Sequence, residues 1–158
     1  MMPELQIRAA TRDDAAPILE MVKELAAYER LLHTVQATEA DLREALFGPR
    51  PVAEAIVADR GGRAVGFALY FHNYSTFIGR PGIYVEDLYV RPAHRGQGIG
   101  GALMRHIIRL ARDRRCGRVE WAALEWNEPA IRFYEAMGAK ALNEWRIFRL
   151  TQEAMEKV

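Results

Sequence analysis

The most informative stretch of the sequence is Arg95-Gly96-Gln97-Gly98-Ile99-Gly100-Gly101, which contains four glycines in its last six positions. Apolar residues follow it at the spacing of an amphipathic helix, so the glycines stand directly before a helix N-terminus. Glycines let backbone N–H groups approach an anion closely, and a helix N-terminus adds further N–H donors and the positive end of the helix dipole. This combination predicts a phosphate or pyrophosphate site, and the alternative is a tight turn without a ligand.

The charge of the chain is distributed unevenly, although its formal total is only +1. The net charge is −3 in residues 1–50 and −2 in residues 119–158, but +5 in residues 81–118, which contain the glycines. A basic middle between acidic ends is consistent with anion binding at the glycine-rich stretch. With 158 residues, half of them hydrophobic, the chain is long enough for one domain with its own core.

Several classes of protein are excluded by what the sequence lacks. A single cysteine, Cys116, excludes a disulfide framework, and the four histidines lack the spacing of metal ligands, so we expect no metal. No apolar run reaches the ~20 residues that span a bilayer, and the N-terminus lacks a signal-peptide core. We therefore expect a soluble, cytoplasmic protein that binds no membrane. The arginines from Arg105 to Arg118 are interpreted as a solvated helix face rather than a nucleic-acid surface.

Hydrophobic periodicity and turn residues predict alternating strands and helices along the whole chain. Strands are expected at residues 6–10, 53–59, 64–74, 83–90, 118–124 and 144–150, and helices at residues 12–31, 38–47, 99–114 and 127–138. The order β-α-α-β-β-β-α-β-α-β predicts an α/β fold with a mixed central sheet flanked by helices. We expect a single domain over residues 1–158, with its core at about residues 5–150.

The expected strand at residues 83–90 contains two carboxylates, Glu86 and Asp87, in an otherwise apolar run. Strict alternation would put Tyr84, Glu86 and Leu88 on one face and Asp87 on the other. A carboxylate in mid-strand is costly unless it is paired or solvated at a site. For Glu86 the alternatives are a functional acid, a carboxylate at a half-open sheet surface, and a structural partner of a core arginine.

A dinucleotide site is the first alternative for the glycine-rich stretch. Gly96, Gly98 and Gly101 match G-x-G-x-x-G, and Glu120 lies near the offset of a ribose-binding acid. The dinucleotide motif belongs to the first βα unit of a larger fold, but only 57 residues follow Gly101. Five residues also separate the strand from the first glycine, and no Gly-Lys-Ser/Thr follows. We therefore reject both a dinucleotide site and a P-loop.

The pattern Arg95-x-x-Gly98-x-Gly100 after an apolar strand resembles the acetyl-CoA motif of the GCN5-related N-acetyltransferases (GNAT). Residues 23–29, 84–90 and 125–134 are also similar to segments of the diamine (spermidine/spermine) acetyltransferases, in the same order. The resemblance covers essentially the whole chain. It implies the GNAT fold, acetyl-CoA as co-substrate without a metal, and direct transfer to an amine in a ternary complex.

The resemblance also implies roles for individual residues. Glu86 is expected to act as general base and Tyr134 as general acid toward the sulfur. Tyr28, Glu29, Glu86 and Asp87 are expected on the substrate side. A polar helix end is the alternative for Tyr28 and Glu29, and a structural salt bridge is an equal alternative for Asp87. The backbone N–H of Leu88 would donate to the thioester oxygen. The residues expected to hold the cofactor are Leu88, Tyr89, Val90, Arg95, Gly96, Gln97, Gly98, Ile99, Gly100, Gly101, Asn127, Glu128, Pro129 and Ala130.

The expected activity is acetylation of a primary amine of a small molecule: a diamine, a polyamine or a basic amino-acid derivative such as thialysine. The family is often dimeric, so the expected assembly is a homodimer. One alternative is acetylation of protein N-termini or lysines on the same fold. Another is a CoA-binding module that does not catalyse.

Overall fold

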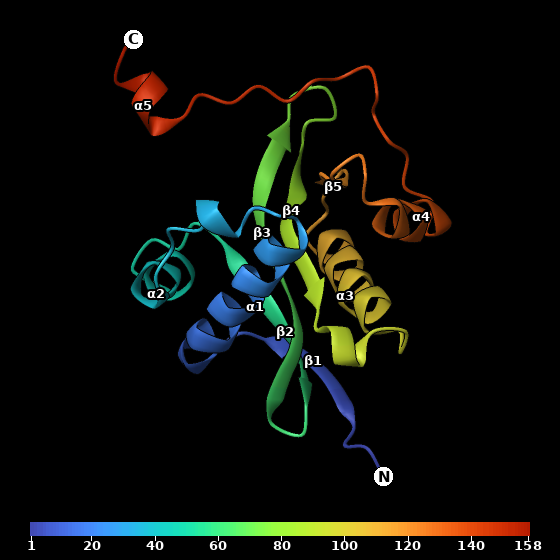
Figure 1. The fold of residues 1–158 in the computed structure, drawn as a ribbon. Helices are drawn as coiled ribbons and strands as arrows, with labels where there is room; N and C mark the ends of the chain where they lie inside the picture. The colour runs from blue at the N-terminus through green and yellow to red at the C-terminus, as the bar shows by residue number, and fades with distance from the viewer. The chain divides into compact units, whose positions relative to one another are not determined.

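The computed structural model describes residues 1–158, which form two compact units, Met1–Ala122 and Ala123–Val158 (Figure 1). The first unit is built on a five-stranded sheet in which the strands follow their order in the chain. Each of the first four strands is antiparallel to the next of the four, and the fifth strand is parallel to the fourth. Its elements are β1 (Leu5–Ala9), α1 (Ala15–Tyr28), α2 (Glu39–Phe47), β2 (Glu54–Arg60), β3 (Arg63–Ser75), β4 (Arg80–Val90), α3 (Ile99–Asp113) and β5 (Val119–Trp121).

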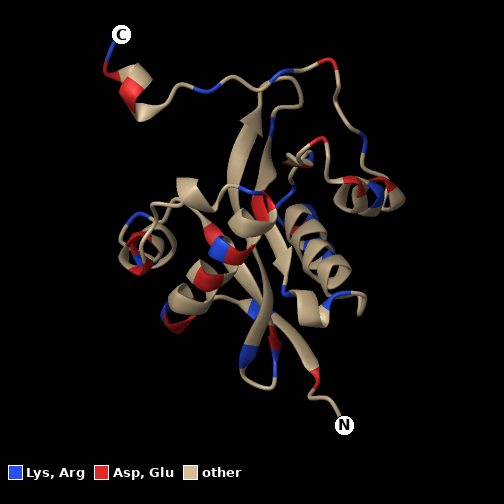
Figure 2. Ribbon diagram, viewed as in Figure 1, with Lys and Arg blue, Asp and Glu red and all other residues tan.

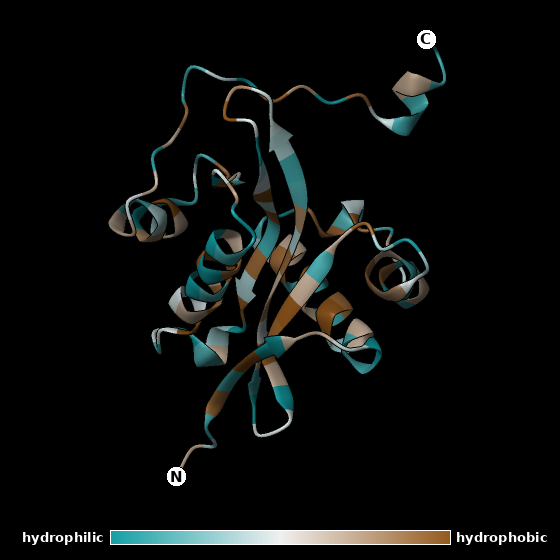
Figure 3. Cartoon of the chain, turned by 180° about the vertical axis from the view of Figure 1, so that it is seen from behind, coloured by the Kyte–Doolittle hydropathy of each residue, from teal (hydrophilic) through white to brown (hydrophobic).

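Two hydrophobic clusters lie on opposite faces of the sheet. On one face Ile99, Leu103 and Ile107 of α3 pack against buried residues of the strands such as Val85. On the other face α1 and α2 cover a second cluster that includes Phe67. Figure 3 shows brown, hydrophobic segments along the strands and on the helices beside them. The helix at the glycine-rich stretch is thus fixed to the sheet by its apolar side.

Local signals in the sequence account for the turns and helix starts. The β2–β3 hairpin closes over Gly61 and Gly62, both of which have positive φ (63° and 83°), as a two-residue hairpin turn requires. Thr38 caps α2 by accepting a hydrogen bond from the backbone N–H of Asp41. Before α1, the carboxylate of Asp14 accepts from the backbone N–H of Thr11 at 2.7 Å. The strands expected at residues 53–59 and 64–74 and the helix expected at residues 38–47 are therefore confirmed.

Asp14 is also the buried centre of an ion-pair network. The guanidinium of Arg8 donates to both carboxylate oxygens of Asp14, at 2.7 and 2.9 Å, and to Asp59 at 3.0 Å. Burial alone would raise the pKa of Asp14, but the hydrogen bonds from Arg8 and Thr11 prevail and hold it below its ordinary value. The network ties the start of α1 to β1 and β2.

The second unit contains α4 (Glu128–Ala136) and the short α5 (Gln152–Met155). The helix at residues 127–138 is confirmed, and its end is closed by Gly138 with φ 98°. The strand expected at residues 144–150 is wrong, because this segment forms no strand and its side chains are exposed. A strand needs a neighbour for its backbone hydrogen bonds, and this segment pairs with none.

Two smaller differences concern lengths. The strand expected at residues 118–124 is confirmed only as the three residues of β5, and the helix expected at residues 12–31 begins as a 3-10 turn and ends at Tyr28. None of the helices is both long and apolar enough to cross a membrane.

Candidate active site

The central strand of the site, β4, carries an extra residue relative to β3. Leu69 of β3 pairs with Asp87, and the next residue of β3, Tyr70, pairs with Val85. Glu86 therefore has no partner in β3 and forms a β-bulge, and its side chain is exposed. Bulges redirect side chains at this kind of position, so a mid-strand carboxylate reaches solvent instead of the core.

The bulge reverses the alternation of β4. Ile83 and Val85 belong to the α3-side cluster, and so do Leu88 and Val90. The predicted strict alternation is therefore wrong: Tyr84 does not share a face with Leu88, because one extra residue shifts the phase by one. The spacing itself held the signal, since apolar positions that step by two and then by three indicate a bulge.

Glu86, Asp87 and Glu29 form an acidic group at this point of the unit. Burial of Asp87 raises its pKa to about 6, and the charges of Glu86 and Glu29 contribute further. Burial also raises the pKa of Glu29, which follows the last residue of α1. The end of α1 and the bulge of β4 thus bring together carboxylates that lie about 60 residues apart in the sequence. Figure 2 shows both acidic and basic residues along α1.

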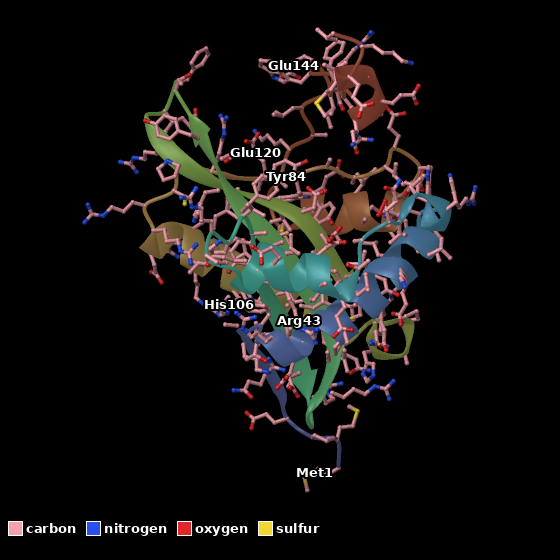
Figure 4. All side chains as sticks on the ribbon, turned by 90° about the vertical axis from the view of Figure 1, so that its left-hand side faces the viewer. Met1, Arg43, Tyr84, His106, Glu120 and Glu144 are labelled. Atoms are coloured by element: carbon pink, nitrogen blue, oxygen red, sulfur yellow. The ribbon has the colours of Figure 1, made fainter.

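Tyr84 and Glu120 continue this side of the sheet, and both are labelled in Figure 4. They occupy paired positions on β4 and β5. The pKa of Tyr84 is raised by burial first and then by the charges of Glu86 and Glu120. Glu120 also pairs with Arg118 at 3.0 Å. The sequence did not assign either residue to the site.

Beyond Val85, the edge of β4 that faces β5 has no strand partner. The β4–β5 ladder covers only residues 83–85, whereas β3 pairs with β4 as far as Val90. The N–H of Arg91 donates to the carbonyl of Val65 in β3 at 2.9 Å, so by alternation the backbone groups of Tyr89 also face β3. Those of Leu88 and Val90 face the open edge, where the carbonyl of Val90 accepts from Arg95. An open strand edge presents N–H and C=O groups that an extended ligand can bind.

The glycine-rich stretch forms an open cradle at the start of α3. Gly96 and Gly98 have φ of 74° and 78°, and a side chain at either position would meet no atom within 4 Å. Gly98 is the N-cap, and the first intrahelical hydrogen bond runs from Ala102 to its carbonyl at 3.0 Å. Residues 99–101 therefore direct N–H groups out of the helix end, while buried Ile99 anchors it. The backbone is arranged as an anion site requires.

The two long side chains of the cradle turn back toward the protein. Gln97 accepts a hydrogen bond from Arg60 of β2. The guanidinium of Arg95 lies 5.4 Å from the ring centre of Tyr28 and 5.5 Å from that of Tyr89, and its Nε donates to the carbonyl of Val90 at 3.0 Å. The expected cofactor residue Arg95 thus contacts the expected substrate residue Tyr28, which no local pattern in the sequence indicated.

The remaining predicted residues lie in the second unit. Asn127 occupies the N-cap of α4 without a capping hydrogen bond from its side chain, and its carbonyl accepts from the N–H of Ile131. Glu128 pairs with Arg132 one turn later, and proline occupies position 129, in the first turn. Ala130 follows in the same turn.

Tyr134 lies on α4 next to Phe133, and their ring centres are 5.4 Å apart. Its side chain is half-buried. No three histidine, cysteine, aspartate or glutamate side chains are grouped so that they could hold a metal ion.

An anion cradle, an open strand edge and an acidic group suit a reaction between a polyanion and a cation. The model of the acetyltransferase (GNAT) family matches residues 18–139. A thialysine N-epsilon-acetyltransferase of Sus scrofa is 39% identical, over 99% of this chain and 98% of the relative. A spermidine/spermine N(1)-acetyltransferase-like protein of Homo sapiens is 33% identical, over 98% of this chain and 24% of the relative.

The fold is also found among solved structures. An integron cassette protein from the mobile metagenome of V. cholerae superposes with a TM-score of 0.81, with 27% identity, 97% of this chain and 96% of that chain covered. The chain belongs to the acetyltransferase (GNAT) family. The predicted fold class and the predicted resemblance are confirmed, and the protein is an N-acetyltransferase. Members of this family use acetyl-CoA.

Proposed function

We propose that the protein transfers the acetyl group of acetyl-CoA to a primary amine of a small cationic molecule: a diamine, a polyamine or a basic amino-acid derivative such as thialysine. The observation that carries this proposal is the acidic group of Glu29, Glu86 and Asp87 beside an open anion cradle. The names of the relatives support the same substrate class.

The chain offers suitable groups for acetyl-CoA. The cradle of Gly96 and Gly98, with the first N–H groups of α3, suits the pyrophosphate. The open edge at Leu88–Val90 suits the extended pantetheine arm, which would pair with it as a strand does. Residues 127–130 of the second unit would contact the cofactor as well.

Transfer requires a neutral amine, because an ammonium group has no lone pair. An alkylamine has a pKa near ~10.4, so roughly one molecule in 10³ is neutral at pH 7. Glu86, exposed on the bulge, would accept the proton of the ammonium directly or through a water. The amine nitrogen then forms its bond to the acetyl carbon, and the bond from that carbon to sulfur breaks.

Two further groups would complete the reaction. The N–H of Leu88 would stabilise the negative charge that develops on the thioester oxygen. Tyr134 would donate a proton to the departing sulfur, and the second proton that the amine nitrogen loses as the amide forms would return to Tyr134, directly or through a water. Asp87, Glu29 and Tyr28 would hold the ammonium groups of the substrate. Burial raises the pKa of both carboxyl groups, and the charges of Glu86 and Glu29 raise that of Asp87 further, so a bound cation would compensate these charges.

The proposal extends to the assembly and location of the protein. We propose that residues 1–158 act as one catalytic domain, since the family model spans the boundary between the two units. A homodimer is supported by the exposed apolar side chains of the C-terminal segment: Trp145 is 73%, Ile147 77% and Phe148 91% exposed. Cys116 is a free thiol, which supports a cytoplasmic location. No metal, nucleic acid or membrane is part of this function.

The test is release of free CoA thiol from acetyl-CoA in the presence of amines that differ in charge. Butylamine and 1,4-diaminobutane form a matched pair, because they have the same chain length and differ by one ammonium group. Thialysine, spermidine and a peptide with a free N-terminus complete the panel. We expect kcat/KM at least ten-fold higher for the diamine than for butylamine.

Three results would contradict the proposal. Absence of turnover with every amine would remove the function altogether, and acetyl-CoA binding without turnover would favour the non-catalytic module. Preference for the peptide, without inhibition by spermidine, would favour a protein acetyltransferase.

For the assembly, light scattering should give the mass of a dimer, and Phe148→Asp should lower this mass.

A further inference from the structure

We propose that Arg95 couples the cofactor site to the amine site, so that bound CoA increases the affinity of the enzyme for its amine. The inference rests on the proposed function of this site. In it Arg95 is a positioning residue, which acts on the substrate through Tyr28.

The guanidinium of Arg95 joins three parts of the first unit. Its Nε donates to the carbonyl of Val90 at the end of β4, and its charge lies 5.5 Å from the ring centre of Tyr89. The guanidinium also lies 5.4 Å from the ring centre of Tyr28, in the last turn of α1. Both ring distances are within the range of cation–π attraction. Arg95 is thus the direct contact between the cradle and the end of α1.

The end of α1 connects Tyr28 to the acidic group of Glu29, Glu86 and Asp87. Glu29 follows Tyr28, and the turn behind it is closed by a hydrogen bond from the N–H of Leu31 to the carbonyl of Ala26 at 2.7 Å. This turn holds Arg30 in the left-handed region, at φ 61°. A rigid turn leaves Glu29 little freedom when Tyr28 is fixed, and the charge of Glu29 acts on Asp87.

Packing does not by itself fix the side chain of Arg95. The residue is exposed and lines a cavity of about 620 Å³ together with Glu24, Tyr28 and Arg63. Its backbone joins directly to Gly96, and glycine restricts the backbone less than any other residue. Pyrophosphate held by the cradle would restrict this backbone and therefore the guanidinium.

The direction of the coupling follows from this connection. When CoA orders the cradle, Arg95 remains stacked on Tyr28, and the end of α1 is held in place for the amine. The amine then binds to a site that is already ordered, which gives positive cooperativity. Because exposed cation–π contacts are individually weak, we expect an effect of about three- to ten-fold in the dissociation constant of the amine.

The experiment measures amine binding by calorimetry with and without saturating CoA, which has no acetyl group and so permits no turnover. In the unchanged enzyme the dissociation constant of the amine should fall three- to ten-fold when CoA is present. Arg95→Met should reduce this ratio to less than two-fold at saturating CoA. Arg12→Met is the matched control, because Arg12 stacks on Phe47 at 6.0 Å, away from the cradle; the ratio should stay unchanged.

A second pair of variants does not depend on any contact between Arg95 and CoA. Tyr28→Phe keeps the ring and should retain the coupling, whereas Tyr28→Leu removes the ring and should lose it. Equal coupling in Arg95→Met and in the unchanged enzyme would overturn the inference. Loss of the coupling in both Tyr28→Phe and Tyr28→Leu would overturn it as well. If the unchanged enzyme acetylates amines without any effect of CoA on amine affinity, only this inference fails. If no amine binds or reacts, the proposed function fails with it.

Discussion

The charge of Glu86 acts on the carboxyl group of Asp87, and the pKa of Asp87 rises to about 6 because burial first, and the charges of Glu86 and Glu29 next, disfavour its ionisation. Glu86 itself stands on the bulge of β4 and is exposed. Two consecutive acids therefore meet different surroundings. The buried one is suited to titrate near neutral pH and the exposed one to exchange protons with a substrate.

Asp87→Asn should change how stability depends on pH. The pKa of Asp87 in the folded protein, about 6, lies above its ordinary value, so the folded state holds the proton more tightly than the unfolded state. Its contribution to stability is present below about pH 4 and is lost as the pH rises through 6. We expect the free energy of unfolding of Asp87→Asn, relative to that of the unchanged protein, to rise by up to about 2 kcal/mol from pH 4 to pH 7. Urea unfolding of both proteins at the two pH values measures this difference.

The same titration should appear in catalysis. Below about pH 6 the protonated Asp87 carries no charge to attract an ammonium group, so kcat/KM for the amine should fall on the acid side. In Asp87→Asn this acid limb should disappear and the KM of the amine should rise. An acid limb that persists unchanged in the variant would assign the titration to another group.

Tyr134→Phe removes the proposed proton donor without changing the ring. We expect kcat to fall about 10²-fold, with the KM values within two-fold, since the proton is needed only when sulfur departs. Tyr74→Phe is the control, because Tyr74 is an exposed tyrosine of β3, and kcat should remain unchanged. A loss of less than three-fold at neutral pH in Tyr134→Phe would remove Tyr134 as the acid.

Gly98→Ala tests the cradle. Gly98 has φ 78° and Gly79 has φ 72°, and a side chain would meet no atom within 4 Å at either position. Both alanine variants should therefore lose a similar stability of about 1 kcal/mol by thermal unfolding, because each strains the backbone. Only Gly98→Ala should raise the KM of acetyl-CoA, by ten-fold or more. Equal KM values in the two variants would place the pyrophosphate elsewhere.

Asp14→Ala tests the network that holds the start of α1. It removes a buried carboxylate and leaves Arg8 and the N–H of Thr11 without their acceptor, so we expect a loss of about 2–4 kcal/mol in urea unfolding. Asp13→Ala changes the neighbouring exposed residue and should cost less than about 0.5 kcal/mol. An equal loss in the free energy of unfolding in both variants would show that the stability of this region does not depend on the ion pair.

The features that the sequence predicted well are those governed by local chemistry. The glycines before α3 and the Gly61-Gly62 hairpin were found because each needs a backbone conformation that few residues adopt. The bulge at Glu86 was missed because strict alternation was assumed, although the apolar spacing held the signal. The roles of Glu86 and Tyr134 stay predictions.

Other features depend on contacts between distant parts of the chain. The stacking of Arg95 on Tyr28 joins residues 67 positions apart, and no periodicity or motif contains such information. The strand expected at residues 144–150 has strand-like alternation, but alternation describes what a segment can do when it has a partner. Pairing is a property of the neighbour as much as of the segment.

The short ladder between β4 and β5 has a practical consequence for handling the enzyme. Without CoA, the edge of β4 after Val85 has no strand partner, and unpaired strand edges promote aggregation by pairing with strands of other chains. The pantetheine arm of the co-substrate would pair with that edge and block this association while it is bound. CoA, the product, has the same pantetheine arm as acetyl-CoA, so enzyme stored with excess CoA should aggregate less on warming than enzyme stored without it.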